Sequence, residues 1–529
     1  MTKTDVPARS ERRGATNSVS RLLTVVIRSG RLTFLVTWAA LSIASIAWAG
    51  STPLGASPDE PAHIIKAAAV VRGEFIGELT SSPAITKVQV PIGLAQASSW
   101  PCYAFNAATG ADCIGRVDSG LTLKSAQTSA GLYNPIYYAI VGLPSLVIPD
   151  TQTSVLAMRF LSGILSSLFL AFAFTGLLRL VRPAIAGAAF FTALTPMVLF
   201  LSGAVNPNSL EIATGAALTV GLLYLVLGAQ GLRRSTVLGF VAASGFLMAN
   251  ARGLSPLWMA VIGIAVLVFS PWSRIRALLA NRGVLVALTV MVGGVIFAGV
   301  WLLRTGTLSA MGVFPGAGKT SLVRGFYEML VNRSIDPGIV GIFGWLDTPA
   351  PAFVYLVWSA LFAALLAGVF ALARGRALAG FLVALAALVF VPPVVQALSV
   401  ERSGFIWQGR YTLVAFVFVT LFAAVAIGRS HFVTERAPAA VGGFVIVVAV
   451  AVFIGQVYSL TTAINRYSGT AASSIVGFLH NPTWAPPGGS LPWIALLALG
   501  MVVVISLWHA AQKLPEPTFE TGEPVIDRV

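Results

Sequence analysis

The chain has 529 residues, of which 57% are hydrophobic and only 10% are charged. Soluble domains carry about 25% charged residues, so lipid must be the solvent for most of this chain. The formal net charge of +15 does not indicate a nucleic-acid partner, because the basic residues are scattered rather than gathered in one domain.

An apolar run over residues 32–50 follows the basic N-terminal residues 1–31. A membrane-spanning helix needs about 20 mostly apolar residues, and this run has nearly that length. It ends in Ala47-Trp48-Ala49, which resembles a signal-peptidase site, so a cleaved signal peptide is the alternative. The length of the run favours an uncleaved first span, and either interpretation leaves the next segment outside the cytoplasm.

Further apolar segments predict an all-α polytopic membrane protein with about twelve spans, within a range of eleven to thirteen. Two of them, residues 236–250 and 254–270, are short for a span. The predicted spans are residues 32–50, 155–178, 184–204, 209–229, 236–250, 254–270, 284–303, 352–373, 377–398, 411–428, 440–460 and 491–510.

Residues 132–149 are also apolar, but they contain Pro135, Pro144 and three tyrosines. Prolines and interfacial tyrosines favour a helix lying on the membrane surface. If this segment stays outside, the later cytoplasmic turns are rich in arginine and hold one acid, Glu435, as the positive-inside rule requires. If it crossed, every one of these turns would lie outside. The arginines are Arg179, Arg182, Arg233, Arg234, Arg274, Arg276, Arg282, Arg374, Arg376, Arg429 and Arg436.

This topology places both termini in the cytoplasm. Residues 1–31 form a basic tail, residues 32–510 the transmembrane domain, and residues 511–529 a disordered tail. Loops 51–154 and 304–351 lie outside, and twelve of the nineteen acidic residues fall on the outer face. Ionisable groups concentrated on one face, opposite plain basic turns, indicate a functional site on that face.

Two adjacent carboxylates, Asp59 and Glu60, follow the first span within the sequence SPDEPAH. In one interpretation Asp59 caps a helix over residues 61–72, with a proline in its first turn. In the other, one carboxylate takes a proton from an acceptor hydroxyl near the lipid headgroups. Adjacent carboxylates raise one another's proton affinity, which suits a base. His63 either shares that proton or is simply solvated.

Both cysteines, Cys102 and Cys113, lie in the first outer loop. Outside the cytoplasm a disulfide between them would stabilise the loop by about 2–3 kcal/mol. Two unpaired thiols are the alternative.

Two short outer links carry further polar residues. The sequence AVNPNSLE between the third and fourth spans contains Asn206, Asn208 and Glu211. In the simpler interpretation this link is a turn, in which Ser209 or Asn208 caps the following helix and Glu211 interacts favourably with the helix dipole. In the other interpretation these polar residues contact a substrate. Arg252 lies outside between two short spans, where it either reaches a lipid phosphate or binds the phosphate of a specific lipid substrate.

The densest polar cluster precedes the tenth span, and a similar one precedes the eighth. Arginine recognises phosphate, and aromatic rings pack on sugar faces. An aromatic belt at the membrane interface is the alternative. The residues are Arg402, Trp407, Gln408, Arg410 and Tyr411 in the first cluster, and Trp345 and Asp347 in the second.

Four motifs in this order resemble a bacterial membrane family, the domain-of-unknown-function family 2142. They are PDEPAH from Pro58, NP at Asn206, GWLD from Gly344 and QGRY from Gln408. That family is similar in architecture to GT-C glycosyltransferases, whose large first outer loop carries juxtamembrane helices and an acidic base. The resemblance implies a plasma-membrane protein with its active face outside. The family often has Asp after Asn-Pro, where this chain has Asn208. This difference puts a metal-binding role of the link around Asn208 in doubt. Whether the protein uses a divalent cation is left open.

The resemblance implies a polyprenyl-phosphate sugar as donor and a cell-envelope glycan, lipid or protein as acceptor. Asp59 or Glu60 would deprotonate the acceptor hydroxyl, and Arg410, Arg402 or Arg252 would hold the phosphate, with inversion at the sugar. A transporter or flippase of a lipid-linked saccharide, and a non-catalytic scaffold, are the competing hypotheses. Transporters usually show broken helices or ionisable residues at mid-membrane. The spans hold almost no charge at mid-depth, which favours the enzyme.

Overall fold

The computed structural model describes residues 21–307, 312–333, 336–428, 438–469 and 476–517. Most of the predicted N-terminal tail, most of the predicted C-terminal tail and the turn with Arg429 and Arg436 therefore lie outside the described residues. The side chains of residues 438–441 are also outside them.

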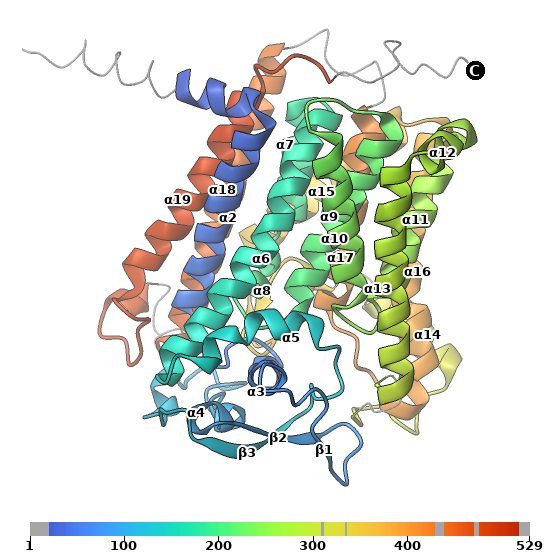
Figure 1. The fold of residues 1–529 in the computed structure, drawn as a ribbon. Helices are drawn as coiled ribbons and strands as arrows, with labels where there is room; N and C mark the ends of the chain where they lie inside the picture. The colour runs from blue at the N-terminus through green and yellow to red at the C-terminus, as the bar shows by residue number, and fades with distance from the viewer. Residues whose placement is uncertain (1–20, 308–311, 334–335, 429–437, 470–475, 518–529) are drawn as a thin grey trace, which may run out of the picture.

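A bundle of long helices forms the body of the molecule (Figure 1). Among the described residues, nine helices are long and apolar enough to cross a membrane. They are α2 Gly30–Ser51, α6 Thr151–Leu180, α9 Pro207–Leu227, α13 Arg282–Thr305, α15 Ala352–Leu372, α16 Gly375–Ser403, α17 Gly409–Gly428, α18 Pro438–Tyr467 and α19 Ser490–Ala511.

Three predicted spans take other forms. Residues 184–204 form α7 Pro183–Ala193 and α8 Pro196–Ser202, which are bent by 62°. The break comes at Pro196, because the residue before a proline disfavours the helical conformation and Thr195 is extended. Residues 254–270 become α11 Ser255–Phe269, which turns by 119° into α12 Trp272–Leu279. The remaining one, α10 Arg234–Ala249, is a shorter apolar helix. Every predicted span thus coincides with helix, while the number of twelve crossings stays a prediction.

Helices α6, α9 and α17 occupy the interior of the bundle. In the apolar 18-residue stretch of α9, and in that of α17, 89% of the stretch is buried inside the protein, compared with 28% in α13. Helix α13 therefore turns most of its surface to lipid, while α9 and α17 are screened by their neighbours on nearly all sides. The ends of these interior helices are the places where polar groups can be enclosed by protein.

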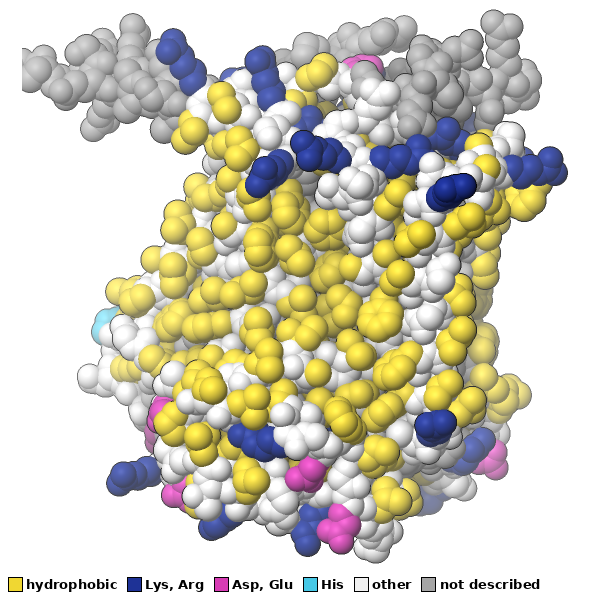
Figure 2. Space-filling view, in the orientation of Figure 1, with side chains coloured by type: hydrophobic (Ala, Val, Ile, Leu, Met, Phe, Trp, Pro, Cys, Tyr) yellow, Lys and Arg dark blue, Asp and Glu magenta, His cyan; other side chains and the backbone are white. Residues whose placement is uncertain are grey.

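The two ends of the bundle differ in charge (Figure 2). A belt of hydrophobic side chains covers the middle of the visible face. Lys and Arg gather at the upper end, whereas the lower end carries both basic and acidic side chains. This arrangement fits a multi-pass membrane protein with an arginine-rich end and a mixed end, and the mixed end is the one that holds the first predicted outer loop (Figure 1).

The segment between α2 and α6 folds into a small module at the lower end. Its antiparallel sheet has the order β1-β2-β3, with Thr86 opposite Thr128, and α3 packs on it. The strands were absent from the sequence-based expectation. The elements are α3 Glu60–Val70, β1 Glu78–Leu79, β2 Thr86–Pro91, α4 Ile92–Ala95, η1 Ala97–Ser99, η2 Ala111–Ile114, β3 Leu123–Thr128, α5 Ile136–Val141 and η3 Leu143–Leu146.

Residues 132–149 do not form a spanning helix. They contain only α5, of 6 residues, and the 3-10 turn η3, of 4 residues. A helix that crosses a bilayer needs about 20 residues, so this segment stays on one side. Leu143, Leu146 and Val147 are exposed, which suits contact with the membrane surface.

The predicted medium loop, residues 304–351, contributes α14 Leu322–Asn332, η4 Pro337–Ile339 and a short hairpin of β4 Ile342–Phe343 with β5 Thr348–Pro349. Helix α14 packs along α16. The hairpin lies against the end of α2, where the rings of Trp48 and Phe343 are 5.0 Å apart. The final loop contains η5 Gly477–Leu479.

Candidate active site

Asp59 stands immediately before α3, in the left-handed backbone conformation with φ 64°. Asp59 occupies the N-cap position of α3, as predicted, but its side chain makes no capping hydrogen bond to the helix. The side chain turns instead toward α17 and is half exposed. A non-glycine residue in this conformation costs about 1–3 kcal/mol, and such strain clusters at functional sites.

Arg410, in the first turn of α17, is the partner of Asp59. Its Nη2 lies 2.5 Å from Oδ2 of Asp59, and its Nη1 donates to the Pro58 carbonyl over 3.0 Å. The guanidinium is buried, and its Nε has no hydrogen-bond partner in the described structure. A buried arginine with a spare donor beside a half-exposed carboxylate can accept a second anion at the same place.

A second arginine lies close to the first. The Arg252 guanidinium stacks 4.4 Å from the Tyr411 ring centroid, and the Arg410 guanidinium lies 5.1 Å from the same centroid. Arg252 Nη1 also donates to Oδ1 of Asn208. Asn208 is fully buried, and its Nδ2 has no partner among the described residues. The two outer links and the start of α17 therefore meet around one tyrosine.

The electrostatic state of Asp59 follows from these neighbours. Burial acts to raise its pKa, but the positive charge and the hydrogen bond of Arg410, with a smaller contribution from Arg252, outweigh that effect and hold the pKa below the ordinary 3.8. Asp59 is therefore an ionised carboxylate at neutral pH. We call Asp59, Arg410, Arg252, Tyr411 and Asn208 the Asp59 cluster.

His63 lies one turn along α3 from Asp59 and is buried. Its Nδ1 is hydrogen-bonded to the Tyr138 hydroxyl at 2.8 Å. Burial lowers the pKa of His63 to about 3, although Asp59 acts in the opposite direction. The imidazole is therefore neutral at pH 7.

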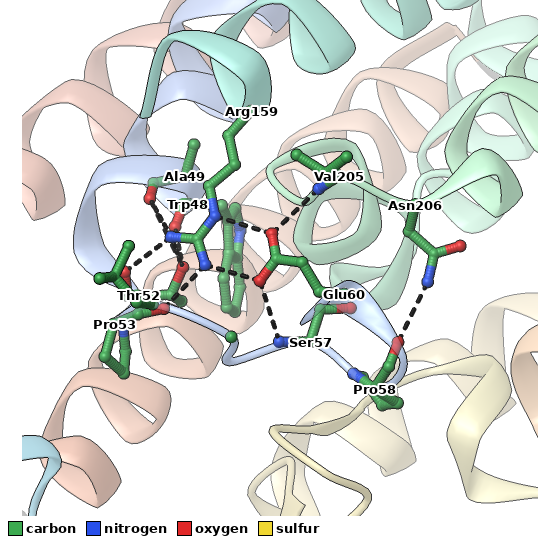
Figure 3. Close-up of polar contacts among 12 residues, drawn as sticks. Trp48, Ala49, Thr52, Pro53, Ser57, Pro58, Glu60, Arg159, Val205 and Asn206 are labelled. Atoms are coloured by element: carbon green, nitrogen blue, oxygen red, sulfur yellow. Dashed lines mark hydrogen bonds and ion pairs between the residues drawn. The ribbon is translucent and has the colours of Figure 1, made fainter. Parts of the chain in front are cut away.

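Glu60 has different surroundings from Asp59 (Figure 3). It is completely buried and forms a two-pronged ion pair with Arg159 of α6, with Nε–Oε1 at 2.8 Å and Nη2–Oε2 at 2.6 Å. The Val205 amide donates to Oε1 over 3.0 Å. The remaining donors of Arg159 reach the carbonyls of Ala49, Thr52 and Pro53. This network joins the end of α2, the start of α3, α6 and the α8–α9 link.

The second outer link is built around Asn206, which caps α9 by accepting from the Asn208 amide over 3.1 Å. The expected caps, Ser209 and Asn208, are therefore wrong, because Asn206 is the residue with extended backbone before Pro207. Asn206 also donates to the Pro58 carbonyl over 3.2 Å, which ties this link to the turn before Asp59. Glu211 lies beyond the first turn, buried, and accepts from Ser255 Oγ over 2.7 Å.

Other predicted site residues brace the outer loops. Trp345 donates to the Gly55 carbonyl over 2.9 Å, and Asp347 pairs with Arg466 at 3.2 Å and accepts from the Phe105 amide. Trp407 is buried and donates to Thr412, and Arg402 lies exposed in the last turn of α16. Gln408 is partly buried, with its Oε1 unpartnered in the described structure. Cys102 and Cys113 form a disulfide.

Three buried cations were missed by the sequence analysis, namely Arg159, Arg466 and Lys66. An arginine inside an apolar span predicts a carboxylate partner, so Arg159 within residues 155–178 was a usable signal. Lys66 gave none. Its Nζ donates to the carbonyls of Phe75 and Gly131 at 2.5 Å each, and burial lowers its pKa to about 7.

The donor set of the Asp59 cluster suits an anion. It offers two guanidiniums and an amide to a ligand, with a single carboxylate among them. Among the described residues, no three His, Cys, Asp or Glu side chains converge as metal ligands would. The chemistry of the cluster therefore favours a phosphate group as its ligand.

The molecule is thus a multi-pass membrane protein with a polar centre at the mixed-charge end of its bundle. The family model described as "Predicted membrane protein (DUF2142)" matches residues 43–419, and the chain belongs to this family. No curated protein matches it. Structures of ArnT from Cupriavidus metallidurans are similar to it. The complex with undecaprenyl phosphate has 14% identity over 90% of this chain and 76% of that one, with a TM-score of 0.45. The apo state has 16% identity over 94% and 77%, with a TM-score of 0.42.

Proposed function

We propose that this protein is an inverting glycosyltransferase that moves a sugar from a polyprenyl-phosphate donor to a hydroxyl group of a cell-envelope acceptor. The observation that carries the proposal is the ion pair of Asp59 and Arg410, with Arg252 beside it. A half-exposed carboxylate lies with one buried and one partly buried guanidinium at the mixed-charge end of a membrane bundle, and these are the groups that a hydroxyl acceptor and a phosphate leaving group need.

The reaction divides between the two kinds of group. Asp59 accepts the proton of the acceptor hydroxyl while the hydroxyl oxygen forms a bond to the anomeric carbon. The bond from that carbon to the phosphate oxygen breaks, and the electron pair leaves with polyprenyl phosphate. Arg410 and Arg252 stabilise the charge that develops on that oxygen, and such electrostatic stabilisation contributes more than any other single effect to catalysis in many enzymes. Because phosphate is a good leaving group, no strong general acid is needed.

Binding of the donor also prepares the base. In the ligand-free protein Arg410 holds the pKa of Asp59 low, which makes the carboxylate a weak proton acceptor. A phosphate that takes up the donors of Arg410 brings a negative charge next to Asp59, and a like charge raises the pKa of a carboxylate. Asp59 thus becomes more basic when the donor is in place. Glu60 is a weaker candidate for this role, because its two oxygens are occupied by Arg159 and backbone amides.

One observation, the break between α7 and α8, could be taken to favour the competing hypothesis of a transporter. In transporters the ends of broken helices line a substrate cavity. Here the break is bonded to other protein segments. Thr195 Oγ1 donates to the Ile339 carbonyl, Met197 N to Val340 O, and Gln456 to the Leu194 carbonyl. The freed backbone groups are therefore used for packing, which supports the transferase.

The test compares Asp59→Asn with Glu78→Gln, a matched loss of an exposed carboxylate in the same module. Cells producing only the Asp59→Asn protein should lose one envelope sugar linkage and accumulate the lipid-linked donor on the outer face, where an impermeant glycosidase can digest it. Glu78→Gln should leave the glycans unchanged. Donor that accumulates only on the inner face would support transport instead, and unchanged glycans with Asp59→Asn would contradict both.

Binding of the leaving group is tested separately on the purified full-length protein. Undecaprenyl phosphate should raise the melting temperature of the wild type, and Arg410→Gln and Arg252→Gln should each reduce that shift. Loss of a hydrogen-bonded charge contact costs about 1.5–3 kcal/mol, or roughly a tenfold to hundredfold weaker binding. Arg324→Gln, an exposed arginine on α14, is the matched control.

A further inference from the structure

A cavity of about 340 Å³ has Arg159, the partner of Glu60, in its wall, and no member of the Asp59 cluster lines it. Four segments form its walls: the end of α2 through Leu54, the segment from Ala111 to Ser119 at the end of the disulfide loop, the start of α6 with Arg159, and the pair Trp484 and Pro487. Its volume falls at the small end of the range of about 300–1,000 Å³ that is usual for small-molecule sites.

The walls of the cavity are held in place by specific bonds. The disulfide of Cys102 and Cys113 closes the loop that contributes Asp112. Thr483 Oγ1 donates to Oδ1 of Asp112 over 2.7 Å, which joins the disulfide loop to the segment with Trp484. Thr151 of α6 donates to the Asp118 carbonyl over 2.8 Å. Arg159 of α6 also donates to the carbonyls of Thr52 and Pro53, so all four walls are bonded together and the cavity is formed before any ligand binds.

The side chains around the cavity combine three kinds of group. Asp112 and Asp150 supply carboxylate oxygens, Gln152 and Arg116 supply N–H donors, and Trp484 supplies an aromatic face. A carboxylate has about four acceptor sites, so the bonds already made to Thr483 and to the α6 N-terminus leave acceptor capacity. The guanidinium of Arg159 is already neutralised by Glu60.

This chemistry selects against the other ligands present at a membrane surface. With Arg159 paired to Glu60, the two carboxylates outweigh the single charge of Arg116, and the net negative lining disfavours a lipid phosphate or any other anion. An acyl chain would displace water from the remaining acceptor sites of the carboxylates and from the amide without offering a hydrogen bond in exchange, which is costly. A sugar has hydroxyl groups that donate to carboxylates and accept from an amide, and its C–H face packs on an aromatic ring. We propose that this cavity binds one neutral sugar unit of the acceptor glycan.

The position of the cavity fits a role in holding the acceptor glycan for the proposed reaction. Thr52, Pro53 and Leu54 line the cavity, and the same segment leads within a few residues to Asp59. Arg159 faces the cavity and binds Glu60, the neighbour of Asp59. The cavity and Asp59 are thus connected by the chain segment from Thr52 to Glu60 and by the ion pair of Arg159 with Glu60. A glycan held in the cavity by one unit can present another unit to Asp59. That the bound glycan is the acceptor of the reaction rests on the proposed function, whereas the binding of a sugar to the cavity does not.

The experiment measures sugar binding directly, on the full-length protein in lipid nanodiscs by saturation-transfer NMR. The probes are cellobiose, maltose and mannobiose at millimolar concentration. At least one should bind the wild type, and Gln152→Ala and Trp484→Ala should each weaken that binding tenfold or more. Gln127→Ala, an exposed amide on β3 outside the cavity, should have no effect. Leu156→Trp, which fills the cavity, should abolish binding and guards against a folding defect in the Trp484 variant.

Two outcomes would overturn the inference. One is that none of the three disaccharides binds, and the other is that binding survives both Gln152→Ala and Leu156→Trp. Failure of the proposed function is recognised separately with Asp59→Asn, which should keep full disaccharide binding. If Asp59→Asn also keeps normal envelope glycans while Gln152→Ala loses disaccharide binding, the cavity is a sugar site and the transferase proposal falls.

Discussion

Asp59 and Glu60 are neighbours in the chain but have opposite surroundings. The carboxylate of Asp59 is half exposed beside Arg410, while that of Glu60 is buried with Arg159. The left-handed turn at Asp59 separates them, because it directs the first side chain toward α17 and starts α3 at the second. The two acids therefore divide into a reactive group and a structural one.

We expect Glu60→Gln to destabilise the protein much more than Asp59→Asn. Removal of the Glu60 charge leaves the buried Arg159 guanidinium without its counter-ion, and such a loss costs about 3–5 kcal/mol. Asp59→Asn also takes the counter-ion from a buried guanidinium, that of Arg410, but Asp59 is half exposed, so water replaces part of the lost interaction and the cost should be smaller. The melting temperatures of the two purified variants in the same detergent provide the measurement.

A double variant tests the cause of the Glu60 effect. Glu60→Gln combined with Arg159→Met removes both charges, so it should be more stable than Glu60→Gln alone. Equal melting temperatures for the single and the double variant would mean that the ion pair is not what Glu60 contributes.

The sequence pattern identified the pair of acids but not their roles. Asp59 is 351 residues from Arg410, and Glu60 is 99 residues from Arg159. These partners are set by how the helices pack, which hydropathy does not encode. Arg252, Asn208, Arg410 and Tyr411 were named for their chemistry alone, and the structure brings them together. Arg402, Trp345 and Asp347 were named for the same reason, and they lie elsewhere or brace loops.

At the scale of elements, small residues allow α2, α6 and α8 to approach closely behind the site. A Cβ added at Gly203, where α8 ends, would lie 2.7 Å from the Ala49 amide nitrogen and 2.8 Å from the Cβ of Trp48. A Cβ at Gly163 of α6 would lie 2.9 Å from the Cβ of Ser45. Small residues at such crossings let backbones pack tightly in a membrane, where no hydrophobic effect drives helices together.

We predict that Gly203→Ala destabilises the protein, whereas Gly239→Ala does not. Overpacking a tight contact costs about 1–3 kcal/mol, and here the nearest atom is backbone, which cannot move aside easily. Gly239 of α10 has no atom within 4 Å of an added Cβ, and alanine there should stabilise the helix by up to about 1 kcal/mol. Thermal unfolding of both variants decides the matter. If both behave alike, the close packing of α8 on α2 is not a constraint.

The positions of the helices were predictable because each needs one long apolar run. The break at Pro196 was not, because prolines also occur inside continuous helices, such as Pro392 and Pro393 in α16. The sheet of the outer module was missed for another reason. Strand β2 does alternate, with Val88 and Val90 buried between exposed Lys87 and Gln89, but it has only 6 residues, and β3 exposes most of its side chains.

At the scale of the whole molecule, everything proposed depends on which compartment the mixed-charge end faces. The arginine-rich end and the mixed-charge end are separated by the apolar belt (Figure 2). The positive-inside rule places the first in the cytoplasm. The Asp59 cluster, the disulfide and the proposed sugar cavity share the second. Because disulfides persist in oxidising compartments, the bond of Cys102 and Cys113 supports the same orientation.

We therefore predict opposite accessibility for two engineered thiols. Glu401 is exposed at the end of the bundle that holds the Asp59 cluster, and Ser235 is exposed at the start of α10, at the opposite end. Each of them is replaced by cysteine in a separate variant. The chain has only two cysteines, and they are paired, so an impermeant maleimide has no background target. In intact cells it should label Glu401→Cys alone, and after permeabilisation both. Labelling of Ser235→Cys alone in intact cells would place the carboxylate and both arginines in the cytoplasm, and an outer-face transferase would then be untenable.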